Sequence, residues 1–103
     1  MLVSACACAG SGTARQANLD RAFARIQVHE ADIEHDRALA AGEEATCDAR
    51  CAAGASALSH GRRLCEIARA AADADALERC ERASRSADMI AASAGVHCHC
   101  ERD

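Results

Sequence analysis

The sequence contains no proline, tryptophan, tyrosine or lysine, and a single phenylalanine, Phe23. More than a quarter of its 103 residues are alanine. Such a chain buries little apolar area per residue, and at roughly 25 cal/mol per Å² its core opposes only weakly the chain entropy lost on folding. We therefore expect one small domain that needs covalent or metal cross-links for stability.

The charge has no strong bias either. The formal net charge is -4, and acidic and basic residues are interspersed along the chain. No basic patch or stripe of the kind that binds nucleic acid stands out, and no basic amphipathic helix that would bind a membrane surface. No nucleophile with an adjacent base, phosphate-binding loop or pair of catalytic carboxylates is recognisable. We predict a non-enzymatic protein that does not bind nucleic acid.

Cysteine, by contrast, is abundant, with eight residues. This density is typical of disulfide-linked proteins of oxidising compartments. Six of them mirror one another about residues 73–75: Cys47, Cys51 and Cys65 before, and Cys80, Cys98 and Cys100 after. Cys47 and Cys65 are 18 residues apart, as are Cys80 and Cys98, and five helical turns separate such positions, so each pair shares one helix face. The pattern predicts an antiparallel helical hairpin that is cross-linked at both ends.

The helices of this hairpin are predicted over about residues 46–72 and 75–95. The first carries Gly54 and Gly61 on its inner stripe. Because glycine costs about 1 kcal/mol relative to alanine inside a helix, we expect another helix to approach closely there. Asp75 and Glu78 have the spacing of a capping box, which predicts the start of the second helix, and Gly95 predicts its end.

A further helix is predicted over residues 14–41, before Gly42. Its inner stripe repeats every three or four residues and consists of Leu19, Ala22, Ile26, His29, Ile33, Asp36 and Ala40. Residues 1–12 lack this periodicity and are predicted to be a flexible leader, and residues 13–103 to form one helical domain. The predicted fold class is an all-α, antiparallel three-helix bundle, with the helix of 14–41 packed along the hairpin.

The spacing also predicts which cysteines pair. If the turn is centred near residue 74, two residues that lie level on the two helices of the hairpin should have sequence positions that add to about 148. Cys65 with Cys80 gives 145, Cys47 with Cys100 gives 147 and Cys51 with Cys98 gives 149. The crossed alternative, Cys47 with Cys98 and Cys51 with Cys100, gives 145 and 151 and fits less well. We predict the disulfides 65–80, 47–100 and 51–98.

A metal site is the alternative at the open end of the hairpin, which is the end opposite the turn. Thiolates and imidazoles bind Zn²⁺ or Cu(I), and the candidate ligands are Cys47, Cys51, His97, Cys98, His99 and Cys100. Disulfides are favoured because Cys65 and Cys80 are isolated and match one to one. No Cys-x-x-Cys motif is present, which makes thiol exchange the weaker reading. The leading hypothesis therefore needs no cofactor, and copper or zinc belongs to the alternative.

The helix of 14–41 carries another, weaker candidate site. His29, Asp32, His35 and Asp36 fall within two turns and have the residue types of a metal or acid–base site. Residues of these types on a helix more commonly form a solvated face, which is the favoured interpretation. His60 is predicted to lie opposite the cysteine stripe and to be exposed.

The beginning of the chain bears on the compartment. Val3 to Cys6 is similar to a bacterial lipobox, which makes Cys6 a candidate for lipidation and leaves Cys8 without a partner. No charged n-region or apolar h-region precedes it, so either the true start lies upstream or the match is accidental. We expect an extracytoplasmic protein, periplasmic or anchored through Cys6, and a cytoplasmic one if the chain starts at Met1 without a signal peptide.

Four segments together resemble a family of small, uncharacterised, cysteine-rich helical bacterial lipoproteins. They are the Cys47-x3-Cys51 motif, residues 64–68 (LCEIA), residues 79–83 (RCERA) and the terminal Cys98-x-Cys100. The resemblance covers residues 44–100 and implies export, membrane tethering and disulfides, but no activity. The Cys-x3-Cys motif is also similar to those of cysteine-rich four-helix bundles that store copper, although this chain has one such motif and three predicted helices.

These observations lead to one functional hypothesis and one alternative. The first is an exported, non-enzymatic structural or interaction protein that binds an unknown protein partner through the helix of 14–41. Leu19, Ile26 and Ile33 would equally suit a coiled-coil homodimer. The alternative is a soft-metal binding or storage protein that uses the cysteines and histidines at the open end of the hairpin.

Overall fold

The computed structural model describes the backbone of residues 2–101 and the side chains of residues 12–101. It is 88% helical and contains three helices, α1 (Leu2–Ala41), α2 (Cys47–Ala71) and α3 (Ala74–His97). No strand occurs among the described residues. The helices pack against one another, which confirms the predicted all-α three-helix bundle.

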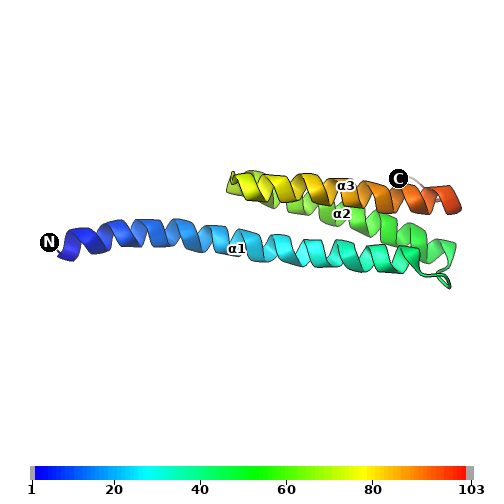
Figure 1. Cartoon of the computed structure of the whole chain (residues 1–103), viewed down its shortest axis with the longest axis horizontal. Coiled ribbons are helices and arrows are strands. Elements are labelled where there is room, and N and C mark those ends of the chain that lie inside the picture. The colour runs from blue at the N-terminus through cyan, green and yellow to red at the C-terminus, as the bar shows by residue number, and fades with distance from the viewer. Residues whose placement is uncertain (1, 102–103) are drawn as a thin grey trace.

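The bundle is elongated, with extents of 67 × 20 × 19 Å. α2 and α3 form the predicted antiparallel hairpin, and α1 runs alongside it (Figure 1). α2 packs extensively on both other helices, whereas α1 and α3 share a smaller interface. The N-terminal part of α1 continues well past the turn between α2 and α3, so this part of the helix faces no other helix (Figure 1).

The first helix starts earlier than expected. We predicted a leader over residues 1–12, but the backbone is helical from Leu2. The side chains of residues 1–11 lie outside the described residues, and so do the hypotheses on Cys6 and Cys8. At its other end α1 stops at Ala41, directly before Gly42, as predicted.

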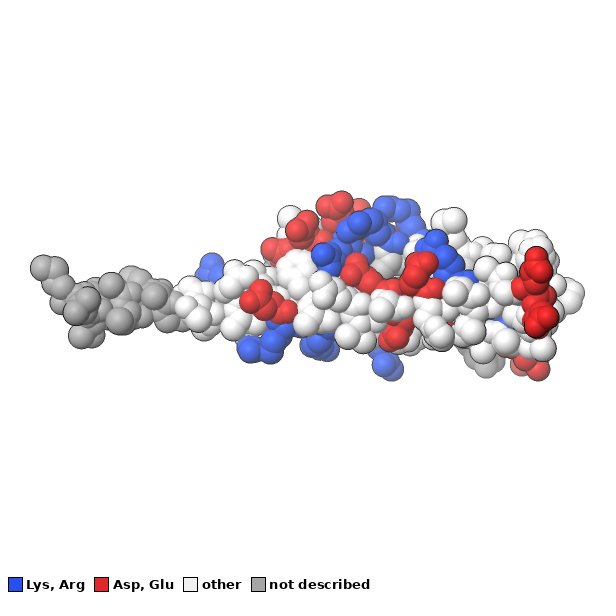
Figure 2. All heavy atoms as spheres, turned by 60° about the horizontal axis from the view of Figure 1, so that its bottom comes forward, with Lys and Arg blue, Asp and Glu red and all other residues white. Residues whose placement is uncertain are grey.

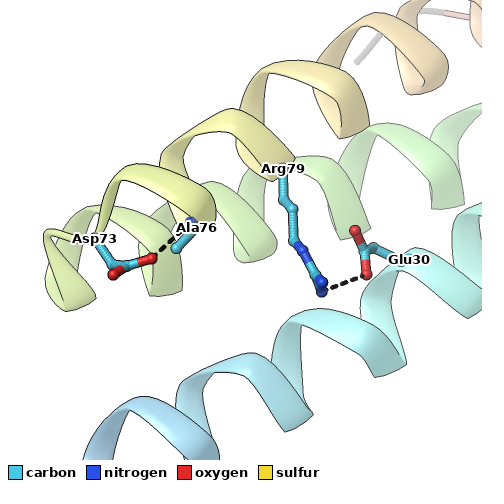
Figure 3. Close-up of polar contacts among 4 residues, drawn as sticks. All are labelled: Glu30, Asp73, Ala76 and Arg79. Atoms are coloured by element: carbon cyan, nitrogen blue, oxygen red, sulfur yellow. Dashed lines mark hydrogen bonds and ion pairs between the residues drawn. The ribbon is translucent and has the colours of Figure 1, made fainter.

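The hairpin helices have side-chain caps, one of which differs from our prediction. The Thr46 hydroxyl accepts a hydrogen bond from the Ala49 amide at the start of α2. At the start of α3 the cap is Asp73, not Asp75: its backbone is extended and its carboxylate accepts from the Ala76 amide (Figure 3). Asp75 already lies in the first turn of α3, where its charge suits the helix dipole. The predicted capping box is therefore wrong.

The predicted end of α3 is also wrong, because Gly95 lies inside the helix, which continues to His97. Glycine permits a helix to end in a left-handed conformation but does not require it, and no described glycine has a positive φ. The left-handed residue of the hairpin turn is instead Ala72, with φ 52°. Ala72 follows the last residue of α2, so the turn is tight.

The core is formed by a few branched residues among many alanines. Ile26 and Leu64 are fully buried, and Ile33, Ile67 and Ile90 are buried beside them. The apolar stripe predicted for the first helix is confirmed, since each of its members from Leu19 to Ala40 is buried or half-buried.

Close packing at the glycines is confirmed as well. A Cβ atom on Gly54 would lie 3.1 Å from the Ala91 Cα atom, and one on Gly61 would lie 3.4 Å from the Ala87 Cβ atom. Small residues thus let α2 and α3 approach within the reach of disulfides.

Polar contacts join α1 to α3. Arg79 extends from α3 to Glu30 on α1, with 3.3 Å between Nη1 and Oε1 (Figure 3). The same guanidinium lies 5.1 Å from the centre of the Phe23 ring, a cation–π distance. On the face that Figure 2 shows, acidic and basic residues lie among one another and do not form a stripe of one sign.

Candidate functional site

Three disulfides cross-link α2 to α3 and to the residues after it. They join Cys65 to Cys80, Cys47 to Cys98 and Cys51 to Cys100, with Cα–Cα distances of 4.7, 5.5 and 5.4 Å. The 65–80 bridge is the predicted one. At the open end the predicted pairs 47–100 and 51–98 are wrong, and the structure has the crossed alternative.

The error came from the assumed position of the turn. α2 ends at Ala71 and α3 begins at Ala74, so these two residues lie level. Cys65 is six residues before Ala71 and Cys80 six after Ala74; Cys47 and Cys98 are each 24 residues away. Both bridges therefore share one register, with a turn centre between residues 72 and 73 and not at 74.

The third bridge depends on the end of α3. Cys98 is the C-cap and has extended backbone, with φ -140° and ψ 150°. The chain therefore leaves the helix at this point, and Cys100 can return along α2 to Cys51. Antiparallel helix geometry alone does not predict this pair, since Cys100 lies beyond the helix.

The soft-metal alternative depends on the sulfurs of this end. Cys47, Cys51, Cys98 and Cys100 are disulfide-bonded in the structure, and a disulfide does not offer the thiolate that Zn²⁺ or Cu(I) binds. His97 and His99 are exposed. The predicted ligand set is thus brought together, but as two disulfides with two surface imidazoles beside them.

A second cluster lies in the interface between α1 and α2. His29 on α1 and His60 on α2 face each other, with 2.8 Å between their Nδ1 atoms and 5.1 Å between their ring centres. This is hydrogen-bond distance, at which one ring donates its Nδ1 proton and the other ring accepts it. His60, which we predicted to be exposed, is half-buried, so that prediction is wrong.

Asp32 completes this cluster. It follows His29 by three residues, which places both on one face of α1. Its Oδ2 atom lies 3.7 Å from His60 Nδ1. One ligand atom from each of the three residues lies within 4.8 Å of the other two, and all three side chains are half-buried. We call these three residues the His–Asp cluster.

The structure divides the four residues that we considered together on α1. His29 and Asp32 belong to the cluster, whereas His35 is exposed. Asp36 is 5% exposed, and its Oδ2 atom has no hydrogen-bond partner among the described residues. Sequence spacing thus identified two members of the cluster and missed His60.

The surroundings favour the neutral form of His29. Its pKa is lowered from the usual value of 6.5, chiefly because burial disfavours the charged imidazolium, and further by His60. Arg63 and Arg25 also lower this pKa, and the Asp32 carboxylate opposes them. At neutral pH the cluster therefore presents a neutral imidazole beside a carboxylate.

A groove lies where α1 runs past the hairpin turn. Its volume is about 600 Å³, and apolar side chains line it from both helices: Leu19 and Ala22 from α1, and Ile67, Ala70 and Ala71 from α2. Arg15, Arg21 and Arg25 border it. The groove is thus lined by apolar side chains, by three arginines and by Asn18.

Comparisons with protein-family models, with curated proteins and with solved structures found no match. None of the described helices is both long enough and apolar enough to cross a bilayer.

Proposed function

We propose that this chain is an exported, non-enzymatic interaction protein, in which a disulfide-linked hairpin holds α1 as the binding surface. The observation that supports it best is the set of three disulfides. Disulfides persist in oxidising compartments and are rare in the cytosol. They support an extracytoplasmic setting, and the proposal includes lipidation of Cys6 as the means of membrane attachment.

The distribution of the cross-links supports the division of roles between the helices. Bridges near the turn and at the open end hold α2 and α3 together. Among residues 12–101, no bridge joins α1 to the hairpin. In this proposal the hairpin is the cross-linked scaffold, and the described part of α1 docks on it without a disulfide.

The groove beside the hairpin turn is the proposed binding site. Its apolar side chains suit the apolar face of a helix, and its three arginines suit acidic side chains beside that face. We propose that the partner is a protein that contributes an amphipathic helix with acidic flanks. A second copy of this chain is the competing occupant that the binding test must distinguish.

The thiol state tests the export part of the proposal. The protein is purified from its own host without reductant, with alkylation at lysis, and its intact mass is measured. Three disulfides make residues 12–101 lighter than the reduced form by six hydrogen atoms. Six alkylated thiols in this region, or bound metal in stoichiometric amount, would contradict the proposal.

Photo-crosslinking in intact cells tests the binding surface. A photoreactive residue replaces Arg15 at the groove, and a control carries it at Glu81, which is exposed on α3. We expect one adduct from position 15 whose partner, identified by mass spectrometry, has an acidic amphipathic helix, and none from position 81. An adduct with the same chain would indicate a homodimer, and equal adducts from both positions would refute the site.

A further inference from the structure

We propose that His29, Asp32 and His60 form a binding site for one divalent transition-metal ion, which joins α1 to α2. This site is distinct from the cysteine–histidine set at the open end of the hairpin. It is also independent of the proposed interaction function, because it uses neither the disulfides nor the groove.

The donor set suits such an ion. Two imidazole nitrogens and one carboxylate oxygen are ligands of borderline ions such as Zn²⁺. All three come from well-formed helices, so their backbone positions are fixed by packing on both sides of the interface. With three protein ligands, a tetrahedral ion keeps its fourth position for water.

The distances are close to those of a loaded site. Ligands at the usual Zn–N length, at tetrahedral angles, are about 3.3 Å apart. The two Nδ1 atoms are 2.8 Å apart, and Asp32 Oδ2 is 3.7 Å from His60 Nδ1. The third separation, between ligand atoms of His29 and Asp32, is bounded only by the 4.8 Å that holds for the whole cluster. Loading the site therefore requires side-chain rotations that bring the three ligand atoms to about 3.3 Å from one another.

The protonation state is compatible with binding. Neutral imidazole is the form that ligates metal, and burial together with the neighbouring His60, Arg63 and Arg25 lowers the pKa of His29. Both arginines are exposed, so water and salt screen their repulsion of a cation. The Asp32 carboxylate supplies the negative charge that an ion in this interface needs.

The position gives the ion a structural consequence. The described part of α1 has no disulfide to the hairpin, whereas the cluster contains residues from both α1 and α2. A bound ion would stabilise only the docked arrangement of α1, because undocking separates His60 from the other two ligands. Metal is thus expected to raise the midpoint of unfolding.

The test measures Zn²⁺ binding to the untagged, full-length, oxidised protein by competition with a chromophoric chelator. Cys6 and Cys8 are replaced by Ser in every protein, so that their thiols do not contribute. We expect one equivalent of Zn²⁺. The stoichiometric site should be lost in His29→Ala and in His60→Ala, and Asp32→Asn should weaken it at least tenfold.

Two matched controls locate the site. His35→Ala removes an exposed histidine from the same helix, and a His97→Ala/His99→Ala protein removes those at the open end of the hairpin; both should bind as the parent does. Circular dichroism checks the fold, and His60→Asn serves as the second variant if His60→Ala unfolds. Less than one equivalent of Zn²⁺, binding that survives loss of His29 and His60, or binding lost in either control would overturn the proposal.

Discussion

The two disulfides at the open end should stabilise the protein in a strongly non-additive way, because they close almost the same loop. Cys47–Cys98 and Cys51–Cys100 have sequence separations of 51 and 49 residues. By the chain-entropy estimate, either bridge alone stabilises by about 4 kcal/mol. Once one is closed, the other closes only a short ring, which contains the five residues 47–51 and the three residues 98–100.

A ring of this size contributes about 2 kcal/mol. Removing either pair, as Cys47→Ser/Cys98→Ser or Cys51→Ser/Cys100→Ser, should therefore cost about 2 kcal/mol in the free energy of unfolding. Removing both pairs should cost about 6 kcal/mol. The measurement is urea unfolding of the oxidised proteins, followed by circular dichroism and extrapolated to water. If removing either pair costs about 4 kcal/mol and the two costs add in the protein that lacks both pairs, this reasoning is refuted.

The pairing itself is tested by a single substitution. In Cys100→Ser the crossed pairing leaves Cys51 free, whereas the pairing that the sequence favoured leaves Cys47 free. Alkylation followed by trypsin distinguishes them, because Arg50 lies between the two cysteines and cleavage there separates them. Label on the peptide that begins at residue 51 is expected. Label on the peptide that ends at Arg50 would mean that Cys100 pairs with Cys47, and that the pairing in the structure is wrong.

Three further predictions concern packing, capping and pH. Gly54→Ala should destabilise the protein by about 1 kcal/mol or more, because the new Cβ atom would lie 3.1 Å from the backbone of α3. Gly95→Ala, which has open space around it, should stabilise the protein by up to about 1 kcal/mol. Thermal unfolding checks both variants. Asp73→Ala should cost about 1 kcal/mol through loss of the α3 cap, more than Asp75→Ala does in the same urea titration. Because the folded-state pKa of His29 is lowered, metal-free protein should lose stability as pH falls below 6.5, where the unfolded chain takes up the proton first. In His29→Ala this loss of stability should be smaller. An equal loss would show that groups other than His29 cause the pH dependence.

Much of the fold was predictable because helical periodicity is a local property. The α1 stripe around Ile26 and Ile33 and the buried glycines of α2 follow from spacing and from the cost of glycine in a helix. The caps were less predictable, since Asp73 and Asp75 are equally good N-cap residues and two positions apart. The choice between them moves the hairpin centre, and that shift was enough to exchange the partners of the open-end cysteines.

The His–Asp cluster was missed for a related reason. His29 and Asp32 are linked by helical spacing, but His60 joins them only through the register of α1 against α2. That register is set by the connection between Ala41 and Cys47. His29 lies twelve residues before Ala41 and His60 thirteen after Cys47, so a turn-centred count of the kind used for the cysteines would have placed them level. A chain of three antiparallel helices has two turns, and each turn brings its own set of distant residues together.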